Sequence, residues 1–134
     1  YAVAGLVKDY APEGWPLDHP MVPHGISVIV NSPAVFRKTG PACAERHWQA
    51  AAAMGADLTD TKVEDGGDIL ADQILGMMRE TDIPNGLSGV GYSMDDIDAL
   101  TDRSYAQKRL IDNGPMPISR DELKDLFRNS MTLW

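Results

Sequence analysis

The chain has 134 residues, of which 43% are hydrophobic, so it fits one domain with a core of its own. Its formal net charge of -8 repels phosphate backbones and anionic lipid surfaces, so neither nucleic acid nor a membrane is expected as a partner. The single cysteine, Cys43, excludes an internal disulfide. No cationic residue stands next to it, which favours a small buried hydrophobe over a reactive thiol.

The first 22 residues are expected to form no long helix. They open with an apolar segment, residues 1–5, that carries neither an initiator Met nor a basic region. We therefore expect further sequence upstream and no signal peptide. Pro12, Pro16 and Pro20 then exclude a long helix from this part of the chain.

An apolar stretch follows Pro23 and predicts a buried helix that begins near His24. Its β-branched residues would also suit a buried strand, because periodicity alone does not separate the two for so short a run. Pro33 argues against a central strand and would kink a helix that continued through it.

Two longer helices are predicted in the middle of the chain. Pro41 suits a first helical position and Gly55 suits a helix end, so the Ala-rich sequence between them predicts a helix. Asp65 can cap a second helix, in which apolar residues recur at helical spacing. Pro84 and Gly86 are expected to end that region.

Two capping boxes mark the starts of the last two predicted helices. In each, a serine is followed three residues later by an acidic residue: Ser93 by Asp96, and Ser119 by Glu122. With these, the sequence predicts five helical segments and no sheet. The expected fold class is therefore all-α.

Two short motifs between the helices resemble binding sites but favour structural roles. Residues 86–91 are rich in glycine, yet they follow no predicted strand, so we expect a loop between helices. Asp95, Asp96 and Asp98 resemble part of a calcium loop, but the glycine and glutamate that such a loop requires are out of place. We expect them to place negative charge in the first turn of a helix.

The chain has three histidines, and His24 is the candidate for a functional role. His47 lies inside the Ala-rich helix and is expected to be partly exposed, while His19 and His24 are separated by prolines and share no helical face. Pro23 fixes the approach to His24, and Gly25 leaves room for a ligand. The positive end of a helix also favours neutral imidazole, the form that binds metal.

A complete metal site is not expected from this chain alone. The sequence has no HExxH motif and no cluster of histidines, whereas catalytic sites usually use three protein ligands. If His24 binds a metal, the other ligands must come from the fold or from sequence outside the chain.

Taken in order, these motifs resemble the iron-dependent (group III) alcohol dehydrogenases, and most closely their transhydrogenase branch. The resemblance rests on residues 5–8, 18–28, 32–36, 45–47, 55–57, 86–87, 90–93 and the last helix. It implies that residues 1–134 form the C-terminal helical domain of the dehydroquinate synthase-like, iron-containing alcohol dehydrogenase fold. In that family an N-terminal α/β domain binds NAD, and this domain is expected upstream.

The resemblance also implies roles for two residues. Members of this family hold a divalent metal with one Asp and three His, and the histidine of their Pro-His-Gly motif maps onto His24. The second His of a His-Gly-x-x-His-Pro motif maps onto Tyr1, and its Pro maps onto Ala2. The tyrosine resembles the transhydrogenase branch and would line the substrate and nicotinamide pocket. The other three metal ligands would lie upstream.

The implied activity is an oxidoreductase reaction in which NAD carries hydride between a hydroxy acid such as 4-hydroxybutyrate and an oxo acid such as 2-oxoglutarate. The metal, iron or alternatively zinc, would act as a Lewis acid on the substrate oxygen. Lys8 is a candidate for binding the substrate carboxylate, with an ordinary exposed lysine as the alternative.

Without the NAD domain the chain is expected to be inactive. A homo-oligomer is compatible with this assignment, in the cytoplasm of a bacterium or the mitochondrion of an animal. The rival hypothesis is a non-enzymatic helical module that binds a protein partner. In an enzyme domain His24 should face a cleft beside Tyr1, whereas an interaction module gives no reason for that arrangement.

Overall fold

The computed structural model describes residues 1–16 and 18–134, and no strand occurs among them. In chain order the helices are α1 (Ala2–Gly5), α2 (His24–Ile29), α3 (Ser32–Thr39), α4 (Ala44–Ala53), α5 (Gly66–Glu80), α6 (Ile97–Tyr105), α7 (Lys108–Ile111) and α8 (Arg120–Asn129). Four short 3-10 turns lie between them: η1 (Gly40–Ala42), η2 (Val63–Asp65), η3 (Ser88–Val90) and η4 (Met94–Asp96). The all-α fold class is confirmed.

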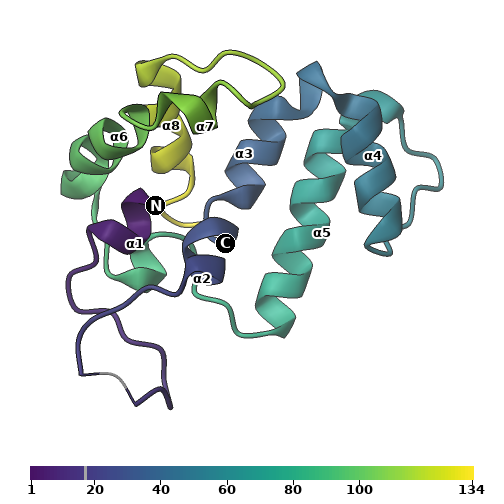
Figure 1. The fold of residues 1–134 in the computed structure, drawn as a ribbon. Helices are drawn as coiled ribbons and strands as arrows, with labels where there is room; N and C mark the ends of the chain where they lie inside the picture. Colours follow the sequence, from purple (N-terminus) through teal and green to yellow (C-terminus); the bar gives the residue numbers. More distant parts are fainter. Residues whose placement is uncertain (17) are drawn as a thin grey trace.

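The helices fall into two groups with α2 between them (Figure 1). One group contains α3, α4 and α5, and the other contains α1, α6, α7 and α8. Helix α3 contacts both α5 and α8, so it joins the two groups. Within the described residues, no helix has both the length and the apolar character needed to cross a membrane.

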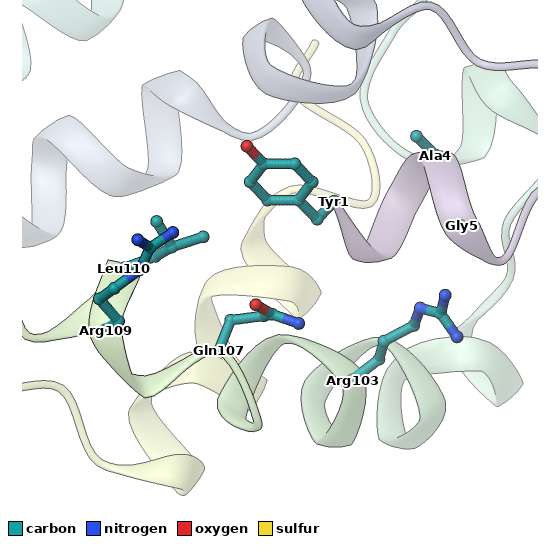
Figure 2. Close-up of a pocket in the computed structure, with 7 residues that line it drawn as sticks. All are labelled: Tyr1, Ala4, Gly5, Arg103, Gln107, Arg109 and Leu110. Carbon is teal, nitrogen blue, oxygen red and sulfur yellow. The ribbon is translucent and has the colours of Figure 1, made fainter.

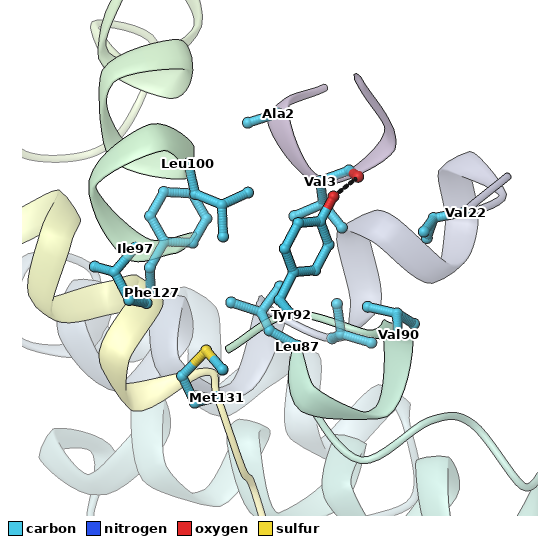
Figure 3. Close-up of a cluster of buried hydrophobic side chains, with 11 residues drawn as sticks. Ala2, Val3, Val22, Leu87, Val90, Tyr92, Ile97, Leu100, Phe127 and Met131 are labelled. Carbon is cyan, nitrogen blue, oxygen red and sulfur yellow. Dashed lines mark hydrogen bonds between the residues drawn. The ribbon is translucent and has the colours of Figure 1, made fainter. Parts of the chain in front are cut away.

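The larger hydrophobic cluster lies under α1 and fixes that short helix to the rest of the domain (Figure 3). Its buried members are Ala2, Val3, Val22, Val30, Leu87, Val90, Tyr92, Ile97, Leu100, Phe127 and Met131. The Tyr92 hydroxyl donates a hydrogen bond of 2.5 Å to the Val3 carbonyl, between residues that are 5% and 3% exposed. This bond ties α1 to the segment that precedes α6.

The second cluster fills the space between α4 and α5 with Ala51, Leu70, Ile74, Leu75 and Met78. Close packing of α5 against η1 depends on two glycines. A Cβ built on Gly67 would lie 2.7 Å from the Cα of Gly40 and 2.7 Å from the Phe36 carbonyl oxygen. A side chain at Gly67 would therefore push these backbones apart.

The start signals of the last two helices are confirmed, because both capping boxes form. The Ser93 and Asp96 pair closes η4 just before α6, and the Ser119 and Glu122 pair closes the start of α8. Asp65 stands at the N-cap of α5 but makes no side-chain cap hydrogen bond. The preceding turn η2 leads directly into α5, which explains why that helix begins there without such a bond.

The Ala-rich helix begins later than predicted, because Pro41 lies in η1 and α4 starts at Ala44. Its end agrees with the prediction: Gly55 follows the helix with a φ of +91°, a conformation that glycine adopts without strain. The prediction of five helices also missed α1 and α7 and joined α2 with α3.

The segment after Pro23 is a helix and not a strand, but the prediction that this helix is buried is wrong. Ser27 is the buried residue of α2, and Val28 is 50% exposed. Helix α2 has only six residues, and although it lies between the two helix groups, these do not cover it on every side. The uncovered side is exposed to solvent. Pro33 causes no kink, since it stands in the first turn of the next helix, α3.

The glycine-rich segment 86–91 is a loop between helices, as predicted. It contains η3 and pairs with the end of the chain: the Leu87 amide donates to the Ser130 carbonyl at 2.8 Å, and the Ser88 amide donates to Met131 at 3.0 Å. Gly86, with a φ of +65°, lies where a side chain would collide with that backbone. The glycine serves this contact.

Candidate functional site

Tyr1 and His24 lie beside each other, although 22 residues separate them in the sequence. Their ring centroids are 5.6 Å apart, and the two rings are tilted by 41°. Tyr1 precedes α1 and is 72% exposed, and His24 is the first residue of α2 and is also exposed. The folding of α1 against α2 therefore brings the two predicted site residues together.

The backbone at the start of α2 presents the imidazole to the surface. Pro23 stands at the N-cap in an extended conformation, and Ser27 donates its hydroxyl to the His24 carbonyl at 2.8 Å. A Cβ at Gly25 would have no atom within 4 Å, so the space next to the histidine is open. Among the described residues, no hydrogen-bond partner reaches the ring nitrogens of His24.

The imidazole of His24 can serve as one ligand of a metal ion, but it does not form a complete metal site by itself. An exposed ring with unpaired nitrogens can donate one lone pair to a metal ion. Within residues 1–16 and 18–134, however, no group of three or more His, Cys, Asp or Glu side chains could hold a metal. A full ligand set that includes His24 needs donors from outside these residues.

A cleft of about 590 Å³ lies beside Tyr1, between α1 on one side and the end of α6 with α7 on the other (Figure 2). It is lined by Tyr1, Ala4, Gly5, Arg103, Gln107, Arg109 and Leu110. The guanidinium of Arg103 lies against Gly5, because a Cβ at that glycine would be 2.8 Å from Nη2. Figure 2 shows Arg103 below Gly5 and Arg109 on the other side of Tyr1.

Lys8 does not lie in this cleft. Its Nζ forms an ion pair of 2.5 Å with Asp96 and is half exposed. The hydrogen bond from Lys8, supported by the Ser93 amide, lowers the pKa of Asp96 below its ordinary value. The alternative reading of Lys8, an exposed lysine without a role in substrate binding, agrees with this position.

The acidic residues near η4 also have structural roles. Asp96 closes the capping box, and Asp98 pairs with Lys124, whose hydrogen bond lowers the pKa of that carboxyl. These contacts agree with charge at the start of a helix and not with a calcium loop.

The prediction that His47 is partly exposed is wrong. His47 is 8% exposed, and its ring contacts the Thr39 hydroxyl at 2.9 Å and the Cys43 sulfur at 3.1 Å. The α3–η1–α4 corner places these side chains together, which the local sequence did not indicate. Cys43, which was predicted to be a small buried hydrophobe, is only partly buried, and its thiol contacts the His47 ring. His19 is an exposed loop residue paired with Asp18.

The cleft residues Arg103, Gln107 and Arg109 were not predicted. Arg103 and Gln107 are four residues apart, a spacing that places two side chains on one helical face. That spacing could have suggested a shared helical face, although α6 ends at Tyr105 and Gln107 stands at the N-cap of α7. Nothing in the pattern indicated that this face meets Tyr1, since the contact joins the two ends of the sequence.

Comparison with protein families finds one match over most of the chain. The model of the C-terminal region of the Fe-containing alcohol dehydrogenase family matches residues 20–131. The chain is 44% identical over 134 residues to "Hydroxyacid-oxoacid transhydrogenase, mitochondrial" of Xenopus laevis and 41% identical to the Homo sapiens protein of the same name. These alignments cover 100% of this chain and 29% of each relative. The chain thus spans less than a third of the length of those relatives.

Solved structures with the same fold include a 1,3-propanediol oxidoreductase, with a TM-score of 0.73 and 22% identity. An archaeal halo-thermophilic alcohol dehydrogenase from a Red Sea brine pool has a TM-score of 0.71 and 20% identity. Each match covers 81% of this chain and 28% of the solved one. At these identities the likeness establishes the fold.

Proposed function

The chain belongs to the Fe-containing alcohol dehydrogenase family, and from this we propose that residues 1–134 form the C-terminal helical domain of an NAD-linked, metal-dependent oxidoreductase. The substrate pair we propose is a hydroxy acid such as 4-hydroxybutyrate and an oxo acid such as 2-oxoglutarate. The names of the relatives from Xenopus laevis and Homo sapiens support this pair. The 29% share of their length supports an N-terminal NAD-binding domain upstream.

The role we propose for His24 is that of a metal ligand, for iron or alternatively zinc. The observation that carries this role is the exposed imidazole, unpaired among the described residues, with its ring 5.6 Å from that of Tyr1. When bound, the metal supplies a Lewis acid for the substrate oxygen. His24 holds that position from α2, and the missing ligands come from the upstream domain.

The role we propose for Tyr1 is to line the substrate and nicotinamide pocket. Its ring centroid is 5.6 Å from that of His24, and Tyr1 also lines the 590 Å³ cleft. A substrate bound in the cleft would therefore contact the tyrosine, which in turn adjoins the imidazole. From this position the ring would help to orient the substrate.

The proposal also extends to the activity of the isolated chain, its location in the cell and its oligomeric state. Alone it is inactive, because His24 is one ligand and the NAD domain is lacking. The relatives' names support a mitochondrial location for an animal protein, and a bacterial one would be cytoplasmic. A homo-oligomer is compatible with it. The rival, a helical interaction module, gives no reason for His24 to lie next to Tyr1.

The test is NADH formation from 4-hydroxybutyrate by the full-length protein that contains this chain, with iron supplied anaerobically. We expect activity that a chelator abolishes and that His24→Ala reduces to the metal-free level. His19→Ala is the matched control, since His19 is an exposed loop histidine paired with Asp18, and it should keep wild-type activity. Wild-type activity in His24→Ala would refute the proposal.

A further inference from the structure

Two arginines face the cleft beside Tyr1 from consecutive helical segments. Arg103 belongs to the last turns of α6 and Arg109 to α7, and both line the same cavity (Figure 2). None of the residues that line this cleft is acidic. Its charge is therefore positive in a chain whose formal net charge is -8.

Arg103 and Arg109 have no carboxylate partner in the part of the chain that the structure describes. Six of the twelve Lys and Arg residues form ion pairs in the described structure: Lys8, Arg37, Lys38, Arg120, Lys124 and Arg128. Within residues 1–16 and 18–134, no carboxylate lies within 4.0 Å of Arg103 or Arg109. Both guanidinium groups keep their hydrogen-bond donors available to a ligand.

The backbone around the cleft makes room for this arrangement. Gly5 allows the Arg103 guanidinium to lie against α1, since a methyl group there would be 2.8 Å from Nη2. The imidazole of His24 also lies next to Tyr1, with the two ring centroids 5.6 Å apart. His24 does not itself line the cleft, but Tyr1 contacts both the cleft and the imidazole and so connects the arginines with His24.

We propose that Arg103 and Arg109 bind the carboxylate of the hydroxy acid and oxo acid substrates. This inference rests on the proposed function and deepens it by assigning the residues that select acids over simple alcohols. Guanidinium matches a carboxylate with two parallel hydrogen bonds, which fixes orientation as well as charge. In 4-hydroxybutyrate, three methylene groups separate the carboxylate from the hydroxyl oxygen. The carboxylate can therefore contact the arginines while the hydroxyl group contacts other residues.

The test compares two substrates of the full-length enzyme, 4-hydroxybutyrate and 1-butanol, which differ in the carboxylate. Arg103→Gln and Arg109→Gln should each lower kcat/KM for the acid by about tenfold to hundredfold, mainly through KM, because a hydrogen bond to a charged group is lost. Values for 1-butanol should stay within about twofold of wild type. Arg46→Gln, an exposed arginine of α4 without an ion pair in the described structure, is the matched control and should change neither.

Three results would overturn the inference. These are equal losses for both substrates, unchanged kinetics for the acid, or a rise in KM for NAD alone, which would assign the arginines to the cofactor's pyrophosphate. Replacement by lysine should restore part of the affinity for the acid, because the charge returns without the paired geometry.

Failure of the proposed function gives a different pattern. If the wild-type enzyme oxidises neither substrate, that function is wrong, and succinate binding to the 134-residue chain then tests the arginines directly by NMR of their side-chain NH groups. Succinate-dependent shifts at Arg103 and Arg109 that vanish in the glutamine variants would retain a carboxylate site. No shift at either arginine would refute it.

Discussion

The hydroxyl of Tyr92 offers a test of how the core holds Tyr1 in place. It donates to the Val3 carbonyl across 2.5 Å and is the side-chain link between α1 and the loop before α6 (Figure 3). Tyr92→Phe removes one oxygen atom and keeps the ring in the core. The Val3 carbonyl then stays buried without its donor.

The expected cost follows from that burial. Leaving a buried carbonyl without its hydrogen bond costs about 1–3 kcal/mol of unfolding free energy. The average unfolding entropy per residue, applied to 134 residues, converts 1 kcal/mol into a shift of about 4 °C in Tm. Tyr92→Phe should therefore lower the Tm by about 4–11 °C.

The assay is thermal unfolding followed by circular dichroism, with Tyr105→Phe as the control. Tyr105 ends α6, is only partly buried and has no hydroxyl hydrogen bond in the described part of the chain, so its variant should melt near the wild-type temperature. A Tyr92→Phe protein that melts within 1 °C of wild type, on the order of a quarter of the expected loss, would refute the reasoning.

The same residue predicts a loss of stability at high pH. Burial, and then the negative charge of Asp96, raises the pKa of Tyr92 from 10.0 to about 12. The folded state therefore favours the protonated phenol, so this contribution is complete below pH 10 and is lost as the pH rises towards 12. Urea unfolding across this range should show the loss in wild type and not in Tyr92→Phe.

Two further predictions concern other parts of the fold. Hydrogen bonds from Lys38 and from Ser119 lower the pKa of Glu122 from 4.5 to about 2. The stability that this carboxylate contributes above pH 4.5 should therefore be lost as the pH falls towards 2. Urea unfolding should show a smaller loss over this range in Glu122→Gln. Gly67→Ala should lower the Tm, because its methyl would lie 2.7 Å from the Cα of Gly40, whereas Gly76→Ala on the same helix meets no atom within 4 Å and should gain about 1 kcal/mol. Equal melting of the two alanine variants would contradict this account of α5 packing.

The parts of the fold that local chemistry determines could be predicted from the sequence. The capping boxes at Ser93 and Ser119 marked the starts of η4, which leads into α6, and of α8, because both partners of each box are three residues apart. The local helix signals also gave the all-α class. The two site residues that the family resemblance implied, Tyr1 and His24, lie beside each other.

The parts that depend on long-range packing could not be predicted. Whether α2 is buried depends on which helices flank it, and the burial of His47 depends on the corner that brings Thr39 to its ring. The cleft at Tyr1 depends on α7 reaching the start of the chain, so the sequence indicated Lys8 as the cation while Arg103 and Arg109 occupy the cleft. Periodicity describes one helix at a time and carries no such information.

The iron content of purified protein, after anaerobic loading with ferrous iron and removal of the excess, tests whether His24 is one ligand of a metal site that upstream residues complete. The account predicts no stoichiometric metal in the 134-residue chain, one metal per full-length protein, and loss of that metal in His24→Ala but not in His19→Ala. One metal bound by the isolated chain and lost in His24→Ala would show a complete site within these residues. Metal retained by full-length His24→Ala would remove His24 from the ligand set.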